Sequence, residues 1–588
     1  MKKLFTILIM LAIFGLSANA QDISYSNKLI KSFKTAKANS QLPNATIHDG
    51  LWLTPFLMEA KQNWKKLTPE AKALFPMINN KAGRPILPSE QFYYSQYFDI
   101  HYTLSGAYAV NPTDANSNGS PDYVEDMAAV FDAVYLKDSL NGFAMPPKDA
   151  GLGGSDFYDV YIGGTTDISS GTYGFVSPED SLGDNPDSPL VETNSWTSWM
   201  CMNWEYSWAS HGTDTSISVT AAHEFMHAIQ MGYNQGMDSW FKESTATWAE
   251  DFHFPGYDDN LQYLVSIFST PDAGLNLDNW NDDLSGSPLN DHWYGTWLFS
   301  KYMTEQTNDA IIKEIYERCI TQGTIDAIDA ELIQSWSTDF FETFDNFLVA
   351  NYFLTDAASY DPYTYTRATV YANAIAGSGG LSIEGDLTYT GSSVDWVSDV
   401  DGNERLMRLS SDYVAVTSTI NFSLTLSPDN TSADINLILI KENSGTSNVD
   451  VIYGTLVGTD YVINVTDAAS FDSFEAIVVR YDETAGDTLS EQYTLTIGAP
   501  TGIDEVNNAY FCVYPNPAKE NINIALTANN YKCIVMTDIL GNTILRNESF
   551  PSNGKMIINT ADLKNGMYFL SLTDIDNKVS TKKISVIH

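Results

Sequence analysis

Basic residues, cysteine and long apolar runs are all scarce in this chain of 588 residues. Its 31 lysines and arginines stand against 74 aspartates and glutamates, which gives a formal net charge of −43 at pH 7. A surface with that charge repels nucleic acid and anionic membranes, so the composition argues against both as partners. After the first 20 residues we expect no transmembrane segment, because no stretch offers about eighteen uninterrupted apolar positions.

The four cysteines, Cys201, Cys319, Cys512 and Cys533, are few for an exported protein and too scattered to form a zinc cluster. Cys512 and Cys533 fall in one small C-terminal unit, where a disulfide between them stays open. The other reading is that the cysteines are small buried hydrophobic residues.

Residues 1–20 have the pattern of a secretory signal peptide. Lys2 and Lys3 are followed by an apolar run, Leu4–Leu16, that is too short to span a bilayer. Ser17–Ala20 then ends in a small-x-small cleavage pattern. The sequence therefore predicts that the chain is exported.

The rest of the chain divides into units of different composition, as expected for this length. Residues 21–92 carry helical periodicity, and we expect either a removable pro-segment or a cap on the next domain. Residues 93–372 mix expected strands at 98–104, 158–163 and 171–177 with expected helices at 123–140, 240–252 and 293–305, which predicts an α+β domain. In the first of these strands the apolar residues alternate and would share one side. An apparent linker at 372–380 leads to 381–498, where short β-rich runs between turn residues predict a β-sandwich. Residues 509–588 form a last small β-unit.

The segment His223-Glu224-Phe225-Met226-His227 has the form H-E-x-x-H inside a stretch that reads as helix from Ile217 to Met231. Two histidines four residues apart lie on one helix face, so both imidazoles can reach one metal ion. Glu224 stands beside them, where it can accept a proton from water. The pattern predicts a catalytic zinc site with His223 and His227 as ligands.

A third ligand is needed, and the residues after His227 exclude the metzincin arrangement, since Gln230 and Tyr233 stand where that class has Gly and His. The stretch Trp240–Glu250 follows the form W-x-x-E-small-x-A-x-x-x-E. Together with H-E-x-x-H, it resembles the gluzincin clan of zinc metallopeptidases over about thirty residues, 219–251. The resemblance implies a zincin-like α+β catalytic domain.

By this resemblance the third zinc ligand is Glu243, presented by a second helix, and Glu250 is a second acid on that helix, which would either orient a ligand histidine or pair with a nearby cation. Glu250, Asp251 and His253 remain the other choices for the third ligand. Gluzincins place a Tyr or His after the zinc helices as oxyanion donor, which implies Tyr294 or His292 here. The expected strand around Tyr173–Phe175 could receive substrate by strand addition.

The expected function is that of a secreted, monomeric zinc endopeptidase with protein or peptide substrates and Glu224 as general base. A first alternative is an extracellular adhesin or glycan-binding protein whose zinc site is structural or inactive. A second is an aminopeptidase, which the missing G-A-M-E-N motif disfavours.

A calcium loop is expected at residues 114–125, because the segment fits D-x-[DN]-x-[DN]-G-x5-E at every position. Gly119 would make the sharp turn. The oxygen ligands would be Asp114, Asn116, Asn118, Ser120, Asp122 and Glu125. The alternative is an Asx-rich turn that caps the following helix.

Four separated segments near the C-terminus, Val513–Ala518, Asp538–Gly541, Leu563–Leu570 and Lys582–Ile587, resemble the C-terminal sorting domain of type IX secretion substrates in Bacteroidota. This resemblance implies the type IX secretion machinery as a partner and a location outside the cell or on its surface. A small adhesive β-module is the alternative.

Overall fold

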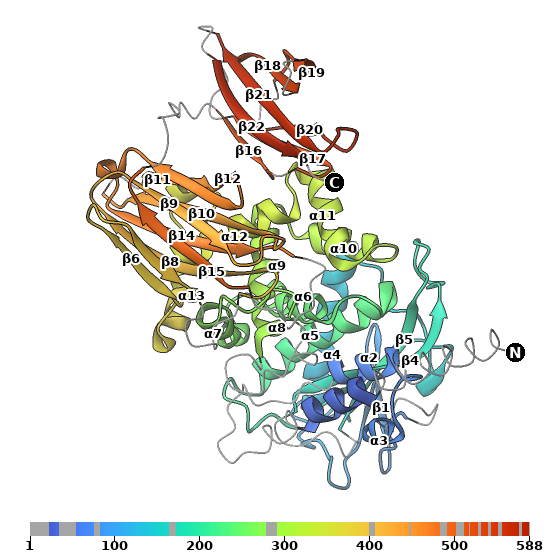
Figure 1. Ribbon diagram of the computed structural model, residues 1–588. Helices are drawn as coiled ribbons and strands as arrows, with labels where there is room; N and C mark the ends of the chain where they lie inside the picture. The colour runs from blue at the N-terminus through green and yellow to red at the C-terminus, as the bar shows by residue number, and fades with distance from the viewer. Residues whose placement is uncertain are drawn as a thin grey trace, which may run out of the picture.

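A computed structural model describes residues 23–34, 54–75, 83–163, 172–277, 291–398, 406–445, 448–482, 491–500, 511–516, 518–526, 531–538, 542–550, 555–575 and 579–586. The predicted signal peptide lies outside these ranges. The chain is a multidomain α+β protein with a helical central region, several β-sheets and a separate C-terminal β-domain (Figure 1).

Three short helices form the N-terminal segment: residues 23–34, α2 (Thr54–Gln62) and α3 (Pro69–Leu74). The N-cap of α3 is Thr68, whose hydroxyl accepts from the Ala71 amide at 3.3 Å. Phe33 packs edge to face on Phe56 and Phe75, with centroids 5.4 and 4.9 Å away. These rings belong to the same hydrophobic core as the central region, so the segment is packed onto the domain that follows it.

The first sheet has the order β1-β2-β3-β5-β4, with parallel inner pairs and antiparallel edge strands. Its strands confirm those expected near residues 98, 158 and 174. Phe98, Ile100 and Tyr102 share one face of β2 as expected, but the other face is buried as well, because β2 is a central strand, and Leu104 lies beyond its end. The strands are β1 (Gln91–Tyr94), β2 (Phe98–Tyr102), β3 (Tyr158–Ile162), β4 (Gly174–Gly183) and β5 (Ser195–Met202).

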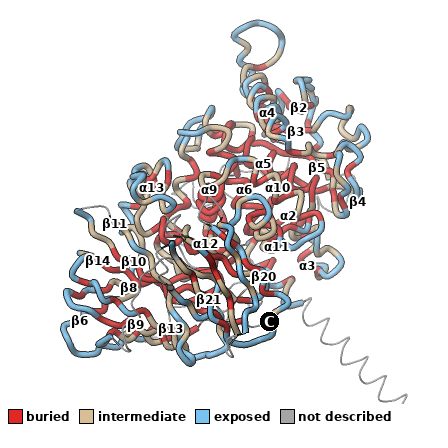
Figure 2. The backbone as a smooth tube through the Cα atoms, turned by 90° about the horizontal axis from the view of Figure 1, so that it is seen from above, coloured by how far each residue is buried: buried red, intermediate tan, exposed pale blue. Residues whose placement is uncertain are grey.

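Helices dominate the remainder of the central region, and Figure 2 shows its buried centre around α5, α6 and α9. The helices expected near 123–140, 217–231 and 240–252 are confirmed. The helix expected at 293–305 is split in two at Thr296. The helices are α4 (Asp122–Leu140), α5 (Thr213–Asn234), α6 (Ser239–His253), α7 (Leu264–Ser269), α8 (His292–Gly295), α9 (Trp297–Gln306), α10 (Ala310–Cys319), α11 (Thr324–Glu331), α12 (Phe340–Phe353) and α13 (Ala368–Ile375).

The linker expected at 372–380 is partly wrong. Residues 372–375 complete α13, and a short 3-10 turn, Ala376–Ser378, follows. Alanine favours helix, and Tyr371 and Ile375 bury their side chains in the central core. The helical conformation ends at Gly379 and Gly380, which both have positive φ.

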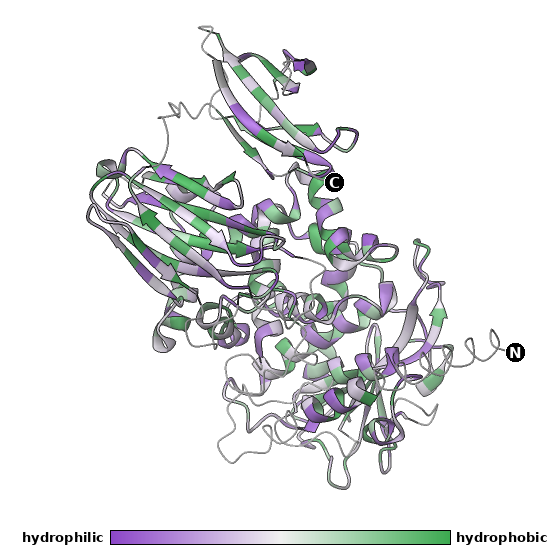
Figure 3. Ribbon diagram, viewed as in Figure 1, coloured by the Kyte–Doolittle hydropathy of each residue, from purple (hydrophilic) through white to green (hydrophobic). Residues whose placement is uncertain are grey.

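Two five-stranded sheets, ordered β11-β10-β14-β8-β6 and β12-β13-β9-β15-β7, form the expected sandwich. The side chains between the two sheets make a core of their own, and the strands are banded by hydropathy (Figure 3). The strands are β6 (Gly385–Tyr389), β7 (Val394–Val397), β8 (Ser410–Ser418), β9 (Phe422–Pro428), β10 (Ile435–Asn443), β11 (Asn448–Tyr453), β12 (Thr455–Val457), β13 (Asp460–Val465), β14 (Ser473–Arg480) and β15 (Tyr493–Gly498).

The sandwich is also fused to the helices. Tyr413, Ile440 and Ile477 lie on the outer face of the first of these sheets and belong to the central core. The Tyr413 hydroxyl donates to the Leu348 carbonyl of α12 at 2.8 Å. Both faces of this sheet are therefore covered, one by the second sheet and one by helices.

The C-terminal β-domain has sheets β16-β17-β20 and β19-β18-β21-β22 and a third, separate core. Cys533 lies on β18 as a free buried thiol, whereas Cys512 lies on β16 in the other sheet, so the disulfide considered between them is not formed. The strands are β16 (Phe511–Tyr514), β17 (Asn521–Leu526), β18 (Tyr531–Asp538), β19 (Thr543–Asn547), β20 (Lys555–Asn559), β21 (Gly566–Asp574) and β22 (Val579–Val586).

Candidate metal centre

Helix α5 is buried on every side, from Ser216 to Tyr233. At Gly232 an added Cβ would touch Pro146 and Pro147, so the absence of a side chain there lets this segment pack closely on the helix. Polar groups inside such a helix cost free energy unless partners satisfy them. The partners of the polar side chains on α5 therefore indicate what the helix is built to hold.

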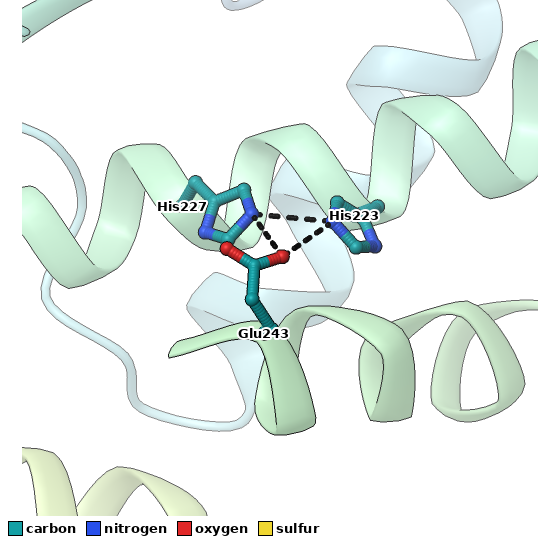
Figure 4. A group of neighbouring side chains, drawn as sticks. All are labelled: His223, His227 and Glu243. Carbon is teal, nitrogen blue, oxygen red and sulfur yellow. Dashed lines mark hydrogen bonds and ion pairs between the residues drawn. The ribbon is translucent and has the colours of Figure 1, made fainter. Parts of the chain in front are cut away.

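Three of these groups meet at one point (Figure 4). The Nε2 atoms of His223 and His227 are 3.2 Å apart. Glu243 of α6 brings its Oε2 to 3.5 Å from the first nitrogen and 3.4 Å from the second. All three ligand atoms lie within 4.8 Å of one another. This buried His/His/Glu group can hold a metal ion.

A second observation indicates that these three side chains suit a divalent metal ion. Among the described residues, Glu243 Oε2 makes no well-formed hydrogen bond, although it is completely enclosed. A buried carboxylate oxygen in that state is strongly unfavourable unless a cation meets it. Two imidazoles and one carboxylate also form a common ligand set of catalytic zinc.

The other acids and bases considered as third ligand are engaged elsewhere. His253 Nε2 contacts Asp138 Oδ1 at 2.9 Å. Asp251 binds Lys301 at 2.9 Å and Arg367 at 3.2 Å. Of the candidates, only Glu243 faces both imidazoles.

Each imidazole is held from behind by a different partner. Glu250 Oε1 lies 2.8 Å from His223 Nδ1, as expected for an acid that orients a ligand histidine. Gln230 Oε1 lies 2.9 Å from His227 Nδ1. The amide orientation of Gln230 is fixed, because its Nε2 donates to the Lys242 carbonyl at 2.9 Å. His227 therefore carries its proton on Nδ1 and presents the Nε2 lone pair to the metal position.

Sequence reasoning missed Gln230 in this role. In the sequence Gln230 only excludes the metzincin pattern, although its place three residues after His227 puts it on the same helix face. Its Nε2 also lies 3.1 Å from Thr245 Oγ1 and 3.0 Å from the Tyr316 hydroxyl, so the amide ties α5 to α6 and α10.

The charge states of His223 and Glu243 suit a cation. Burial lowers the pKa of His223 to about 4, so this imidazole is neutral at neutral pH. Burial alone would raise the pKa of Glu243, but the facing His227 and His223 hold it at about 2, so the carboxylate is ionised. Burial lowers the pKa of His227, but the Glu243 and Glu224 carboxylates outweigh burial and raise it, and a bound cation would oppose that protonation.

Glu224 lies beside the group with one carboxylate oxygen engaged. Its Oε2 accepts from the Thr54 hydroxyl of α2 at 2.6 Å. Among the described residues Oε1 has no hydrogen-bond partner. Burial raises the pKa of Glu224 to about 7, which is the range of a general base that exchanges protons at neutral pH.

The two expected oxyanion donors are placed differently, although both lie on α8. The Tyr294 ring centroid is 6.1 Å from that of His223, and burial together with the Glu243 carboxylate raises the pKa of Tyr294 well above its usual value. His292 Nε2 is instead bonded to the Gly274 carbonyl at 3.0 Å. Of the two residues, Tyr294 is the one whose ring the fold brings next to the metal group.

The expected calcium loop precedes and enters α4. Asp114 accepts from the amides of Asn118 at 3.1 Å and Gly119 at 2.9 Å. Gly119 has a φ of 97°. Asn116 Nδ2 donates to Glu125 at 2.8 Å, and Asn118 contacts the same carboxylate. Of the other two expected ligands, Asp122 accepts from the Ala115 amide at 3.0 Å and Ser120 donates its own amide to Asn118 at 3.0 Å.

Comparison with known proteins identifies the C-terminal β-domain. The family model described as "Secretion system C-terminal sorting domain" matches residues 512–587. This finding agrees with the motifs at that end of the chain. The protein is a cargo of type IX secretion, and it is delivered to the cell surface or outside the cell.

A curated relative matches over a short length only. An endo-acting ulvan lyase of Formosa agariphila is 38% identical over 74 residues, which are 13% of this chain and 14% of the lyase. So short a share of that enzyme carries no argument about the activity of this chain.

Similar solved structures include the CBM51-2 and INT domains of Clostridium perfringens ZmpB, with 10% identity, a TM-score of 0.11 and coverage of 31% of this chain and 73% of that one. The adhesin domain of Epf from Streptococcus pyogenes has 12% identity, a TM-score of 0.11 and coverage of 30% and 70%. Scores this low carry no argument. A search of the described helices found none with the length and apolar character to cross a membrane.

Proposed function

We propose that this secreted protein is a zinc-dependent endopeptidase acting on extracellular protein or peptide, with a zincin-like catalytic domain. The convergence of His223, His227 and Glu243 beside a buried Glu224 carries the proposal. Bound zinc would supply a Lewis acid that makes water more acidic and polarises a peptide carbonyl. The three ligands would hold it, and Glu250 and Gln230 would keep the two imidazoles in position.

Glu224 is the residue that would move protons. Its enclosed carboxylate would accept a proton from the attacking water and return it to the leaving amine. Its near-neutral pKa, about 7, suits both transfers. A carboxylate on the surface would hold that proton much less well.

Tyr294 would stabilise the oxyanion that develops on the peptide carbonyl. Its hydroxyl stays protonated at any physiological pH, because burial and the Glu243 carboxylate raise its pKa. A neutral donor beside the metal group is what such an oxyanion requires. Strand β4, at the edge of its sheet and in contact with α5, would align an extended substrate.

We also propose that residues 114–125 bind Ca²⁺ in a structural role. The support is that Asp114, Asn116, Asn118 and Glu125 turn toward a common centre around Gly119. Calcium would replace the contacts that the amide groups now make with these carboxylates.

The proposed activity is tested with casein and quenched fluorescent peptides. Hydrolysis is expected to depend on stoichiometric zinc, to stop with a chelator and to be lost in Glu224→Gln. Equal cleavage of acetylated and free-amine peptides would support an endopeptidase over an aminopeptidase. A structural zinc site in a binding protein predicts a different result. Removing the zinc would then lower stability only, and neither zinc removal nor Glu224→Gln would change any hydrolysis.

A further inference from the structure

The proposed catalytic group is closed to large molecules. His223, Glu224, His227 and Glu243 are each at most 1% exposed. A peptidase must bring the bond that it cuts to the metal, and no polypeptide can reach side chains enclosed to that degree. Some element of the chain therefore covers the group.

Helix α2 of the N-terminal segment lies directly on it. The Thr54 hydroxyl donates to Glu224 Oε2 at 2.6 Å and accepts from the Val176 amide of β4 at 2.8 Å. The Thr54 hydroxyl thus hydrogen-bonds both to the proposed general base and to a main-chain amide of the strand proposed to align the substrate. Both groups are needed by a substrate.

The rest of α2 anchors this contact. Leu57 is buried against the central core, as are its neighbours Phe56 and Met58. The Met58 carbonyl accepts from Gln235 Nε2, just beyond the end of α5, at 3.3 Å. A helix of nine residues has little stability alone, so α2 depends on the surface that it covers.

We propose that the N-terminal segment is an intramolecular inhibitor of the metal centre, seated through α2 on the surface formed by β4, α5 and α6. This proposal rests on the proposed peptidase function. A purely structural cap needs only the apolar contacts of Phe56, Leu57 and Met58. The Thr54 hydroxyl adds two polar contacts, and these compete with substrate and water for Glu224 and the Val176 amide. In this proposal the observed conformation is the inactive form of the protein.

The test uses the full chain loaded with Co²⁺ and two readouts. The first is the rate at which a chelator removes the metal, followed by visible absorbance. The second is hydrolysis of a quenched fluorescent peptide. Leu57→Asp places a charge in the seat of α2, and Gln62→Asp places the same charge on an exposed position of the same helix as a control.

Leu57→Asp is expected to raise both rates by about tenfold or more, because each follows the fraction of molecules with an open site. Gln62→Asp is expected to match the wild type. Faster metal removal without hydrolysis in any variant would support the seat of α2 and refute the peptidase. Unchanged metal removal in a folded Leu57→Asp variant would overturn the inhibitor proposal.

Thr54→Val provides an independent variant if Leu57→Asp does not fold, since it keeps the side-chain volume and removes the hydroxyl. Amide exchange at Val176 and chelator access to Co²⁺ are both expected to become faster. If both remain at the wild-type rate, Thr54 does not hold the site closed and the proposal fails.

Discussion

The central helices and the β-sandwich differ in what they bury. Helices α5 and α6 enclose two imidazoles and several carboxylates in the middle of an apolar core. In the sandwich, strand β15 alternates buried Tyr493, Leu495 and Ile497 with half-exposed threonines. Burying a charge destabilises a fold unless a partner compensates for it. Helices α5 and α6 bear a cost that strand β15 avoids, and a metal ion bound between the imidazoles and the Glu243 carboxylate would offset that cost.

Buried charge alone does not mark the site. Arg84 meets Asp149 at 2.5 Å and Glu179 at 2.7 Å and also contacts Asp159, all with little exposure, in a cluster that is closed by its own opposite charges. Glu243 Oε2 and Glu224 Oε1 differ, because the described residues offer them no hydrogen bond. Other buried carboxylate oxygens also lack a hydrogen bond, so the distinguishing feature is that the Glu243 carboxylate converges with two imidazoles.

The largest expected effect separates chemistry from stability. Glu224→Gln should retain the metal and lower kcat by about 10²–10⁴-fold, because it removes the general base. Leu495→Ala in the sandwich core should lower the free energy of unfolding by about 2–5 kcal/mol and leave kcat of the folded protein unchanged. Metal analysis, peptide hydrolysis and thermal unfolding measure the two outcomes. A sandwich variant that lost activity while folded would break the contrast.

A smaller effect is expected behind the imidazoles. Gln230→Leu leaves His227 Nδ1 and the Lys242 carbonyl unpaired, so metal affinity should fall by about 10–100-fold. Glu250→Leu should do the same through His223. Glu250→Gln is the matched control, since its amide oxygen still accepts from the imidazole and should preserve most of the affinity. Competition with a chromophoric chelator measures all three, and equal losses in Glu250→Leu and Glu250→Gln would argue against an orienting role.

Local patterns predicted the elements well where one period dominates. The helical spacing of His223 and His227 and the short β-rich runs of residues 381–498 both predicted the observed elements. Residues 372–375 were misjudged as linker, because small residues look flexible until the burial of Tyr371 and Ile375 is known. The split at Thr296 likewise depends on tertiary packing of α8.

Long-range contacts were beyond sequence reasoning. Nothing near Thr54 indicates that its hydroxyl meets Glu224, which is 170 residues away. His292 and Tyr294 are two positions apart and chemically equivalent as donors, and only the packing of α8 sends one to Gly274 and the other toward His223. The resemblance to gluzincins pointed to Glu243, whereas Gln230 required the fold.

A pH effect is expected where the sandwich does bury a charge. Burial, aided by Asp386, raises the pKa of Glu475 on β14 from 4.5 to about 8. Between about pH 4.5 and 8 the folded state therefore holds a proton that the unfolded state releases. The free energy of unfolding falls as pH rises through this range, by at most about 1.4 kcal/mol per pH unit. Glu475→Gln should remove this slope and raise Tm at pH 8. Parallel Tm–pH curves for the two proteins would contradict a buried, proton-holding Glu475.

The smallest effect is expected at the exposed loop 114–125, where ligand groups are already solvated and their convergence costs little. Calcium at about 100 times its Kd should stabilise the chain by about 2.7 kcal/mol, which raises Tm modestly in a protein of this size. Glu125→Gln should abolish that calcium-dependent rise. Asp126→Asn removes the same charge from an exposed neighbour and should keep it. If both variants lose the rise equally, calcium responds to the general charge of this surface rather than to specific ligands in the loop.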